Sequence, residues 1–249
     1  MREGSVASER VRASRNILLG RLSPADQALI EPHVQEKTFA CGASLLGPDE
    51  LLDAVYFPAT ALVALEDGSH PGHSVEIALV GREGMLGWPA LLGSERSCHT
   101  AWVRMRAGTV LRVPLKPLHT ACNASPSLQA ALLQFVNVMF VQMARAIACG
   151  VQHSLHQRLA RWLLMRHDRL AGDVLAVNHD EIAANMNVRR ASVTDGLHVL
   201  EGERLVRSTR GRIAIRNRSG LEVFAGDAYG AAEAEYRLMI APFGKTAPC

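Results

Sequence analysis

The stretch NHDEIAANMNVRRASVTDGLHVLEGERLV, residues 178–206, decides the fold of the C-terminal half. Asn178 is followed three residues later by Glu181, a capping box that predicts the start of a helix. Asn187 stands where that helix must end, because asparagine tolerates the left-handed backbone of a tight turn. A second helix follows, with an inner apolar face made of Val193, Leu197 and Leu200. The stretch therefore predicts two helices joined by a short turn.

The outer face of the second helix is polar and basic. In a helix-turn-helix this helix enters the major groove of DNA, and side chains near its start reach base edges. The candidate DNA-binding residues here are Arg189, Arg190, Ser192, Thr194, Asp195 and His198, with His179 at the start of the first helix. An ordinary helical hairpin with a solvated polar face has the same pattern and is the alternative interpretation.

A basic hairpin is predicted directly after the two helices. Residues 205–208 and 212–215 have the composition of short strands around Thr209-Arg210-Gly211, and this hairpin carries Arg207, Arg210 and Arg212. Residues 151–218 hold twelve arginines and no lysine against seven acidic residues, whereas the whole chain has 27 basic and 24 acidic residues. This local excess favours a wing that contacts phosphates over a solvated edge hairpin.

A long helix is predicted over residues 126–153, before the basic region. Its apolar side chains recur at steps of three or four, and Ser154 with Gln157 forms a capping box that starts a new helix. Such a long apolar stripe usually has a partner helix, often from a second subunit. The predicted dimer face comprises Leu132, Phe135, Met139, Met143 and Ile147. Packing along its own domain is the alternative.

The N-terminal half has a different pattern. Residues 37–115 alternate short apolar segments with glycine-rich turns, which is typical of a β-sandwich or barrel. Residues 16–34 have helical spacing, with Ser23 as a plausible N-cap before Pro24. The predicted organisation is a flexible arm (1–16), a β domain (17–125), the long helix (126–153), a winged helix-turn-helix (154–225) and a C-terminal tail (226–249).

Several classes of protein are excluded at this stage. We find no apolar run of the roughly 18 residues that a membrane span needs, and the polar N-terminus argues against secretion, so a cytoplasmic location without a membrane is expected. The five cysteines are scattered and form no C-x-x-C pair, which favours buried thiols over zinc or redox chemistry. Acidic clusters such as Asp49, Glu50 and Asp53 lack a base–nucleophile pair, so no enzyme is predicted.

The order of these segments resembles the Crp/Fnr family of bacterial transcription regulators, over about residues 16–225. The motifs that carry the resemblance are Tyr56-Phe57-Pro58, Val80-Gly81-Arg82-Glu83-Gly84, His153-Ser154, Arg158–Leu164 and Val188–Thr194. The resemblance implies an α+β fold with a cyclic-nucleotide-binding-like β-roll (a jelly roll), a dimerisation helix and a winged helix-turn-helix. It also implies a homodimer on double-stranded DNA, with recognition helices in successive major grooves and RNA polymerase as a possible partner.

The chain departs from the cyclic-nucleotide-binding members of that family. Those members carry a Gly-Glu step and then Arg-Ser/Thr-Ala, whose arginine neutralises the cyclic phosphate and whose glutamate holds the ribose. The corresponding residues here, which are the candidate effector pocket, are Gly87, Trp88, His99, Thr100 and Ala101. Because Trp88 and His99 supply neither the carboxylate nor the fixed positive fork, we predict no cyclic nucleotide in the usual mode.

The sequence leaves the cofactor, the DNA target and the binding partner of the winged domain open. No cofactor is predicted, residues 1–40 lack the cysteine cluster of iron–sulfur sensors, and the histidines leave haem or a metal open. Arg190 corresponds to the family's guanine-reading arginine, whereas Ala191 and Asp195 differ from the best-known member, so the target sequence should differ too. The alternative function is a ligand-binding module whose winged domain contacts protein instead of DNA.

Overall fold

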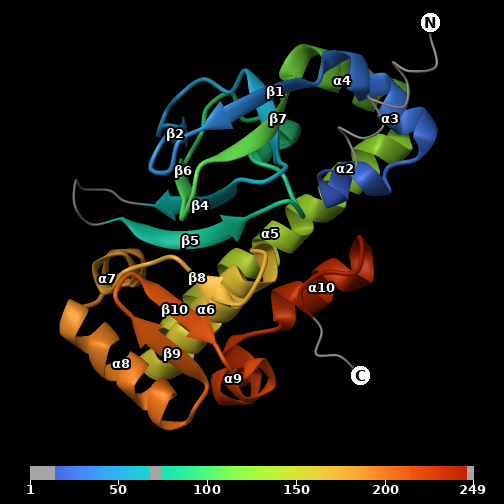
Figure 1. Cartoon of the computed structure of the whole chain (residues 1–249). Helices are drawn as coiled ribbons and strands as arrows, with labels where there is room; N and C mark the ends of the chain where they lie inside the picture. The colour runs from blue at the N-terminus through green and yellow to red at the C-terminus, as the bar shows by residue number, and fades with distance from the viewer. Residues whose placement is uncertain (1–14, 68–73, 246–249) are drawn as a thin grey trace, which may run out of the picture. The chain divides into compact units, whose positions relative to one another are not determined.

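The computed structural model of the chain describes residues 15–67 and 74–245. Its helices and strands confirm the predicted α+β class (Figure 1). In chain order they are α2 (Ile17–Arg21), α3 (Pro24–Ile30), η1 (Glu31–His33), β1 (Gln35–Phe39), β2 (Ser44–Leu46), β3 (Ala54–Pro58), β4 (Leu62–Asp67), β5 (Val75–Val80), η2 (Trp88–Leu92), β6 (Thr100–Arg104), β7 (Gly108–Pro114), α4 (Leu115–Ala124), α5 (Pro126–Gln152), α6 (Leu155–Arg169), β8 (Val174–Leu175), α7 (His179–Met186), α8 (Arg190–Gly202), β9 (Val206–Thr209), β10 (Arg212–Ile215), α9 (Arg218–Ala225), η3 (Gly226–Ala228) and α10 (Ala231–Met239).

The described residues divide into two compact units. Unit 1 comprises those of 1–65, 80–138 and 236–242, and unit 2 comprises those of 66–79, 139–235 and 243–249. The boundary passes through β4, β5, α5 and α10, which therefore contribute residues to both units. Unit 1 contains most of the β-roll, and unit 2 contains the predicted winged helix-turn-helix.

The β-roll consists of antiparallel strands with small apolar side chains inside. One sheet has the order β1-β7-β3 and the other β2-β6-β4-β5. In the first sheet Arg112 on β7 lies between Gln35 on β1 and Tyr56 on β3. The short apolar segments predicted within residues 37–115 are confirmed as the strands β3 to β7. The two short strands β1 and β2 were not predicted, because their side chains are mostly exposed or too few to show a pattern.

The chain enters unit 1 through a buried asparagine, which corrects the predicted extent of the flexible arm. Asn16 is 0% exposed, and its amide donates to the carbonyl oxygens of Pro58 and Gly84, both at 2.9 Å. Its side-chain oxygen also accepts from the Leu19 N–H at 3.0 Å and caps α2. Residues 1–14 of the predicted arm lie outside the described residues. Ser23 caps α3 as predicted.

The predicted dimer face of α5 is wrong for three of its five residues. Leu132, Phe135 and Met139 are each at most 1% exposed in the single chain, so they are unavailable to a partner. The Phe135 ring lies against Gly84, where an added methyl group would come within 2.1 Å of it. The apolar stripe of α5 therefore has two halves. The chain itself covers the inner half, whereas the outer half lies on the other side of the stripe.

The outer half of that stripe is exposed in the described chain. Ile147 is 71% exposed and Val151 is 84% exposed. Phe140 and Ala144 complete a series at steps of four, three and four residues along the exposed face of α5. This spacing is that of a coiled-coil seam. Of the predicted face, Ile147 belongs to this series, whereas Met143 is half-buried beside it.

Helix α5 also corrects the expectation about apolar runs. Within the described residues it is the one helix long and apolar enough to cross a membrane, by length and composition alone. A core helix of a soluble protein passes the same test. Its Gln142 is 3% exposed and accepts a hydrogen bond from the Leu79 N–H at 2.7 Å. A buried amide with a backbone partner is what an interior helix of a folded protein requires.

Helix α6 begins at the predicted capping box, since both reciprocal hydrogen bonds of Ser154 and Gln157 are present. Its Arg166 is 1% exposed and pairs with Glu76 of β5, whose side chain is 7% exposed. The guanidinium stacks on the Trp162 ring at 3.3 Å from the centroid. A buried arginine thus has both a carboxylate and an aromatic face, which offsets its desolvation.

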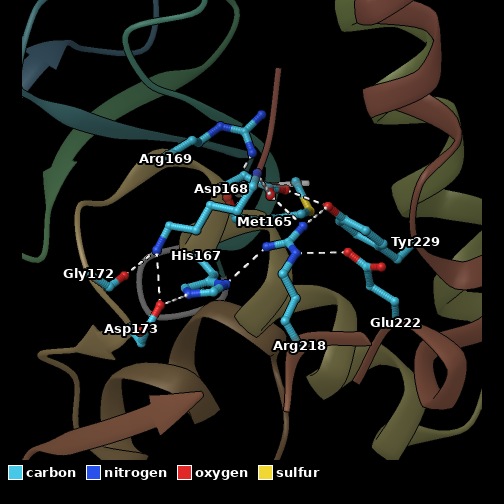
Figure 2. A network of polar contacts seen from close by, with 10 residues as sticks. Met165, His167, Asp168, Arg169, Gly172, Asp173, Arg218, Glu222 and Tyr229 are labelled. Atoms are coloured by element: carbon cyan, nitrogen blue, oxygen red, sulfur yellow. Dashed lines mark hydrogen bonds and ion pairs between the residues drawn. The ribbon is translucent and has the colours of Figure 1, made fainter. Parts of the chain in front are cut away.

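The predicted C-terminal tail, residues 226–249, contains η3 and helix α10. Helix α10 ends in unit 1, where the Tyr236 hydroxyl donates to the Glu83 carbonyl at 2.7 Å. In unit 2, Arg218 of α9 donates to Asp168 of α6 at 2.6 Å and to the Tyr229 hydroxyl at 2.8 Å (Figure 2). The Tyr229 hydroxyl in turn donates to Asp168 at 2.6 Å. This buried network fastens α9 and η3 to α6.

Candidate nucleic-acid interface

The two helices predicted from residues 178–206 are α7 and α8. Both reciprocal bonds of the Asn178–Glu181 capping box are present, and Asn187 has the left-handed conformation with φ 51° and ψ 54°. The inner face of α8 is closed, because Val193, Leu197 and Leu200 are each 0% exposed. The sequence folds in this way because each local signal agrees with the burial that the helix pair requires.

The outer face of α8 presents the predicted polar side chains to solvent. Arg189, Arg190, Asp195 and His198 are exposed, and Ser192 and Thr194 are half-buried. Arg189 and Arg190 stand at the N-terminal end of α8, as expected for side chains that reach base edges. We name α8 the recognition helix from here on.

Arg190 is oriented by Asp180, an acidic residue that was not among the predicted site residues. Its Nε lies 3.1 Å from Oδ1 of Asp180 on α7, and both side chains are about two-thirds or more exposed, at 67% and 71%. An exposed pair of this kind contributes little stability. The contact does, however, place the Arg190 side chain between the two helices, with Nε engaged by the carboxylate.

The predicted hairpin is present as β9 and β10, joined by Arg210 and Gly211. Thr209 lies opposite Arg212 and Val206 opposite Ile215, and β8 completes a small sheet in the order β8-β10-β9. Ile213 and Ile215 are buried, whereas Arg207, Arg210 and Arg212 are exposed. We call residues 206–215 the wing. The exposed arginines of the wing are therefore carried by a strand pair whose isoleucine side chains are buried.

His179 and Thr194, two of the predicted DNA-binding residues, lie together and contact each other. The His179 Nδ1 is 3.0 Å from the Thr194 hydroxyl oxygen, and its Nε2 is 3.3 Å from the Ser208 hydroxyl oxygen of β9. Ser208 was not predicted as a site residue, because a serine on a short strand carries no signal in the sequence. The structure thus links the first helix, the recognition helix and the wing through one imidazole.

The candidate effector residues lie in unit 1. Gly87 has φ +77°, and a side chain there would come within 2.7 Å of the Ala54 carbonyl oxygen, so glycine is required. Trp88 is 6% exposed and begins η2, so its indole fills interior space. Nδ1 of His99 is buried without a hydrogen-bond partner among the described residues. Thr100 and Ala101 begin β6, and Ala101 is fully buried.

Metal ligands do not gather anywhere in the described ranges. Across residues 15–67 and 74–245, no group of three or more His, Cys, Asp or Glu side chains could hold a metal ion. Cys41 and Cys98 are exposed, whereas Cys122 and Cys149 are buried, and burial raises the pKa of both buried thiols. The prediction that the dispersed cysteines are buried small hydrophobic residues is confirmed for Cys122 and Cys149 and is wrong for Cys41 and Cys98.

Comparison with known proteins gives a consistent result. A family profile described as a Crp-like helix-turn-helix domain matches residues 157–224. The transcriptional regulator SdrP of Thermus thermophilus is 30% identical over 179 residues, which cover 70% of this chain and 84% of that protein. A solved Crp/Fnr-family regulator from Thermus thermophilus is 27% identical, with a TM-score of 0.63 over 77% of this chain and 98% of that one. FixK2 of Bradyrhizobium japonicum shares the fold, with 18% identity and a TM-score of 0.67 over 78% of this chain and 98% of that one.

The fold and the basic surface of unit 2 define a winged helix-turn-helix protein of the class that binds DNA. The family profile covers only residues 157–224, whereas the similarity to SdrP covers 70% of the chain. The chain belongs to the Crp/Fnr family of transcription regulators, as the sequence motifs indicated.

Proposed function

We propose that this regulator binds DNA as a homodimer and reads an inverted repeat, with one recognition helix in the major groove of each half-site. The observation that carries the proposal is the common exposure of Arg190 on α8 and of Arg210 on the wing, within one anchored unit. The pairing of Arg190 Nε with Asp180 leaves the terminal nitrogens of the guanidinium for the O6 and N7 edge of a guanine. Arg210 at the hairpin turn suits a phosphate contact.

The dimer face that we propose is the exposed half of α5. Phe140, Ala144, Ile147 and Val151 repeat at coiled-coil spacing on a helix of 27 residues. Two such helices packed along a two-fold axis would cover these side chains and would place two recognition helices on one face of DNA. Half-sites about 10–11 bp apart would then match the protein symmetry.

DNA binding with a steep salt dependence tests the proposal. Fluorescence anisotropy should use a duplex selected by the wild-type protein from a randomised library, beside a scrambled duplex of equal composition. Phosphate contacts release counterions, so the affinity should fall steeply and linearly on logarithmic axes as salt is raised. A winged domain that contacts protein instead would give weak binding to both duplexes.

Two arginine variants should separate base reading from phosphate anchoring. Arg190→Ala is expected to cost roughly 1–3 kcal/mol per contact and to relax specificity at one position per half-site. Arg210→Ala is expected to weaken binding to selected and scrambled duplexes alike and to reduce the salt slope by about one per subunit. If both variants keep wild-type affinity, specificity and salt slope, the proposed DNA surface is wrong.

Cyclic AMP is expected not to bind in the usual mode, because Trp88 fills interior space and His99 replaces the phosphate-binding arginine. Titration calorimetry on the purified protein should show no saturable heat at micromolar protein. The variant Trp88→Glu with His99→Arg restores the family's polar residues and serves as the comparison. Saturable, micromolar binding to the wild-type protein would contradict this prediction and would place the ligand on other residues.

A further inference from the structure

The His179 ring occupies a position between three elements of unit 2. It belongs to the first residue of α7, contacts Thr194 of the recognition helix at 3.0 Å and contacts Ser208 of the wing at 3.3 Å. The backbone N–H of Ser208 also donates to Oε1 of Glu201, on the recognition helix, at 2.6 Å. Ser208 is therefore held by α7 through its hydroxyl and by α8 through its backbone.

The hydrogen-bond partners of this ring favour one arrangement of its protons. The Thr194 hydroxyl donates to the Arg190 carbonyl oxygen at 3.2 Å, so its one proton is already used. With that proton on the Arg190 carbonyl, the Thr194 oxygen accepts from His179, and the bridge as we propose it has the proton of the neutral ring on Nδ1. Nε2 is consequently the acceptor, and the Ser208 hydroxyl donates to it.

This arrangement joins the two parts of the proposed DNA surface. Thr194 lies one helical turn after Arg190, the proposed base-reading residue, and Ser208 lies two residues before Arg210, the proposed phosphate contact. A change in the His179 bridge would therefore alter how the recognition helix sits relative to the wing. Contacts that must be made simultaneously are sensitive to such small displacements.

We propose that His179 is a positioning residue that sets the register between the recognition helix and the wing and thereby determines sequence specificity. The inference rests on the proposed DNA-binding function. In this proposal the His179 and Thr194 side chains form an internal bridge. His179 Nδ1 faces the Thr194 hydroxyl, and His179 Nε2 faces the Ser208 hydroxyl. Specificity should then depend on a residue that need not touch a base.

The first test compares binding of the selected and scrambled duplexes. His179→Ala is expected to lower the ratio of selected to scrambled affinity about five- to tenfold, the scale of one or two hydrogen bonds. The salt slope should stay at its wild-type value, because the phosphate contacts are unchanged in number. His33→Ala, at an exposed histidine of unit 1, is the matched control and should leave the ratio unchanged.

Two conservative variants test each arm of the bridge. His179→Asn keeps a donor near the position of Nδ1, and His179→Gln keeps an acceptor near the position of Nε2, so each should recover part of the lost ratio. Ser208→Ala combined with His179→Ala should cost less than the sum of the two single changes, because both remove one shared hydrogen bond. Full additivity, or no recovery by either amide, would overturn the proposal.

Nitrogen-15 NMR of the His179 ring provides a readout that is independent of DNA. The neutral ring is expected to carry its proton on Nδ1, and a proton on Nε2 would overturn the bridge as drawn. If the wild-type protein fails to select or bind any duplex, the proposed function fails, and the NMR result still decides the bridge. If the wild-type protein binds and His179→Ala keeps the wild-type ratio, the positioning role is wrong.

Discussion

Replacement of Asp168 by asparagine is expected to destabilise unit 2 by about 3–5 kcal/mol, because it leaves the buried Arg218 without its main counter-charge. The Asp168 side chain is 0% exposed and that of Arg218 is 13% exposed, so water cannot replace the lost carboxylate. The second acidic partner, Glu222, lies 2.8 Å from Arg218 Nε but is 38% exposed. The Tyr229 hydroxyl would also lose the oxygen to which it donates at 2.6 Å (Figure 2).

Urea denaturation measures this loss of stability. Hydrogen exchange in residues 155–169 shows whether the loss arises in α6. Asp173→Asn is the control, since Asp173 belongs to the same network but its side chain is 69% exposed. We expect it to leave the midpoint near the wild-type value. Asp168→Leu with Arg218→Met should recover much of the loss, because an apolar pair leaves no buried charge. An unchanged midpoint for Asp168→Asn would show that solvent or Glu222 compensates Arg218 in full.

The same network sets the ionisation of a neighbouring histidine. Arg218 donates to Nδ1 of His167 at 3.0 Å, so the ring must be neutral at that nitrogen, and Nε2 donates to Asp173 at 2.9 Å. Burial lowers the pKa of His167, with the Asp173 hydrogen bond acting in the opposite direction. Burial likewise raises the pKa of the Tyr229 hydroxyl, which keeps it a donor to Asp168. The network therefore depends on two groups that burial keeps uncharged.

The sequence predicts those parts of the fold that depend on local signals. The capping boxes at Ser154 and Asn178, the left-handed Asn187 and the apolar face of α8 are all encoded within a few residues, and the structure confirms each. The strands β3 to β7 are predicted for the same reason, since glycine-rich turns separate short apolar runs. In these places propensity, pattern and burial agree.

Long-range pairings are what the sequence could not reveal. The partner of Arg166 is Glu76, ninety positions away, and the partner of Tyr236 is the Glu83 backbone. Neither pairing leaves a periodic trace in the sequence. The helix α10, which carries Tyr236, was not predicted. The His179 bridge escaped for a similar reason, because Ser208 becomes significant only when β9 folds back beside α8.

The predicted dimer face shows a different limit of sequence reasoning. Apolar residues on α5 recur on both sides of the helix, so periodicity marks an amphipathic stripe but does not say which half the chain itself covers. Phe135 and Met139 face inward and Ile147 and Val151 face outward, although all four fit the same spacing. The choice depends on what packs against the helix, such as Gly84 beside Phe135.

Ile147→Glu with Val151→Glu is therefore expected to convert the proposed dimer into a monomer. Both side chains are largely exposed in the single chain, at 71% and 84%, so the change should leave each protomer folded. Across a two-fold seam it would instead bring four carboxylates together in an apolar interface, where unpaired charge is costly. Analytical ultracentrifugation at micromolar protein should show the loss of the dimer, and circular dichroism should show an unchanged helix content.

The matched control is Gln134→Glu with Gln152→Glu, which adds the same charge to exposed positions of α5 outside the apolar series. It should remain dimeric. The monomeric variant should also lose roughly 100-fold or more in affinity for the selected duplex, because the second half-site is no longer bound intramolecularly. Its affinity for a single half-site should persist, since the recognition helix and the wing are intact. A variant that stays dimeric would place the seam outside this series, and a monomer with undiminished affinity would show that one protomer reads the whole site.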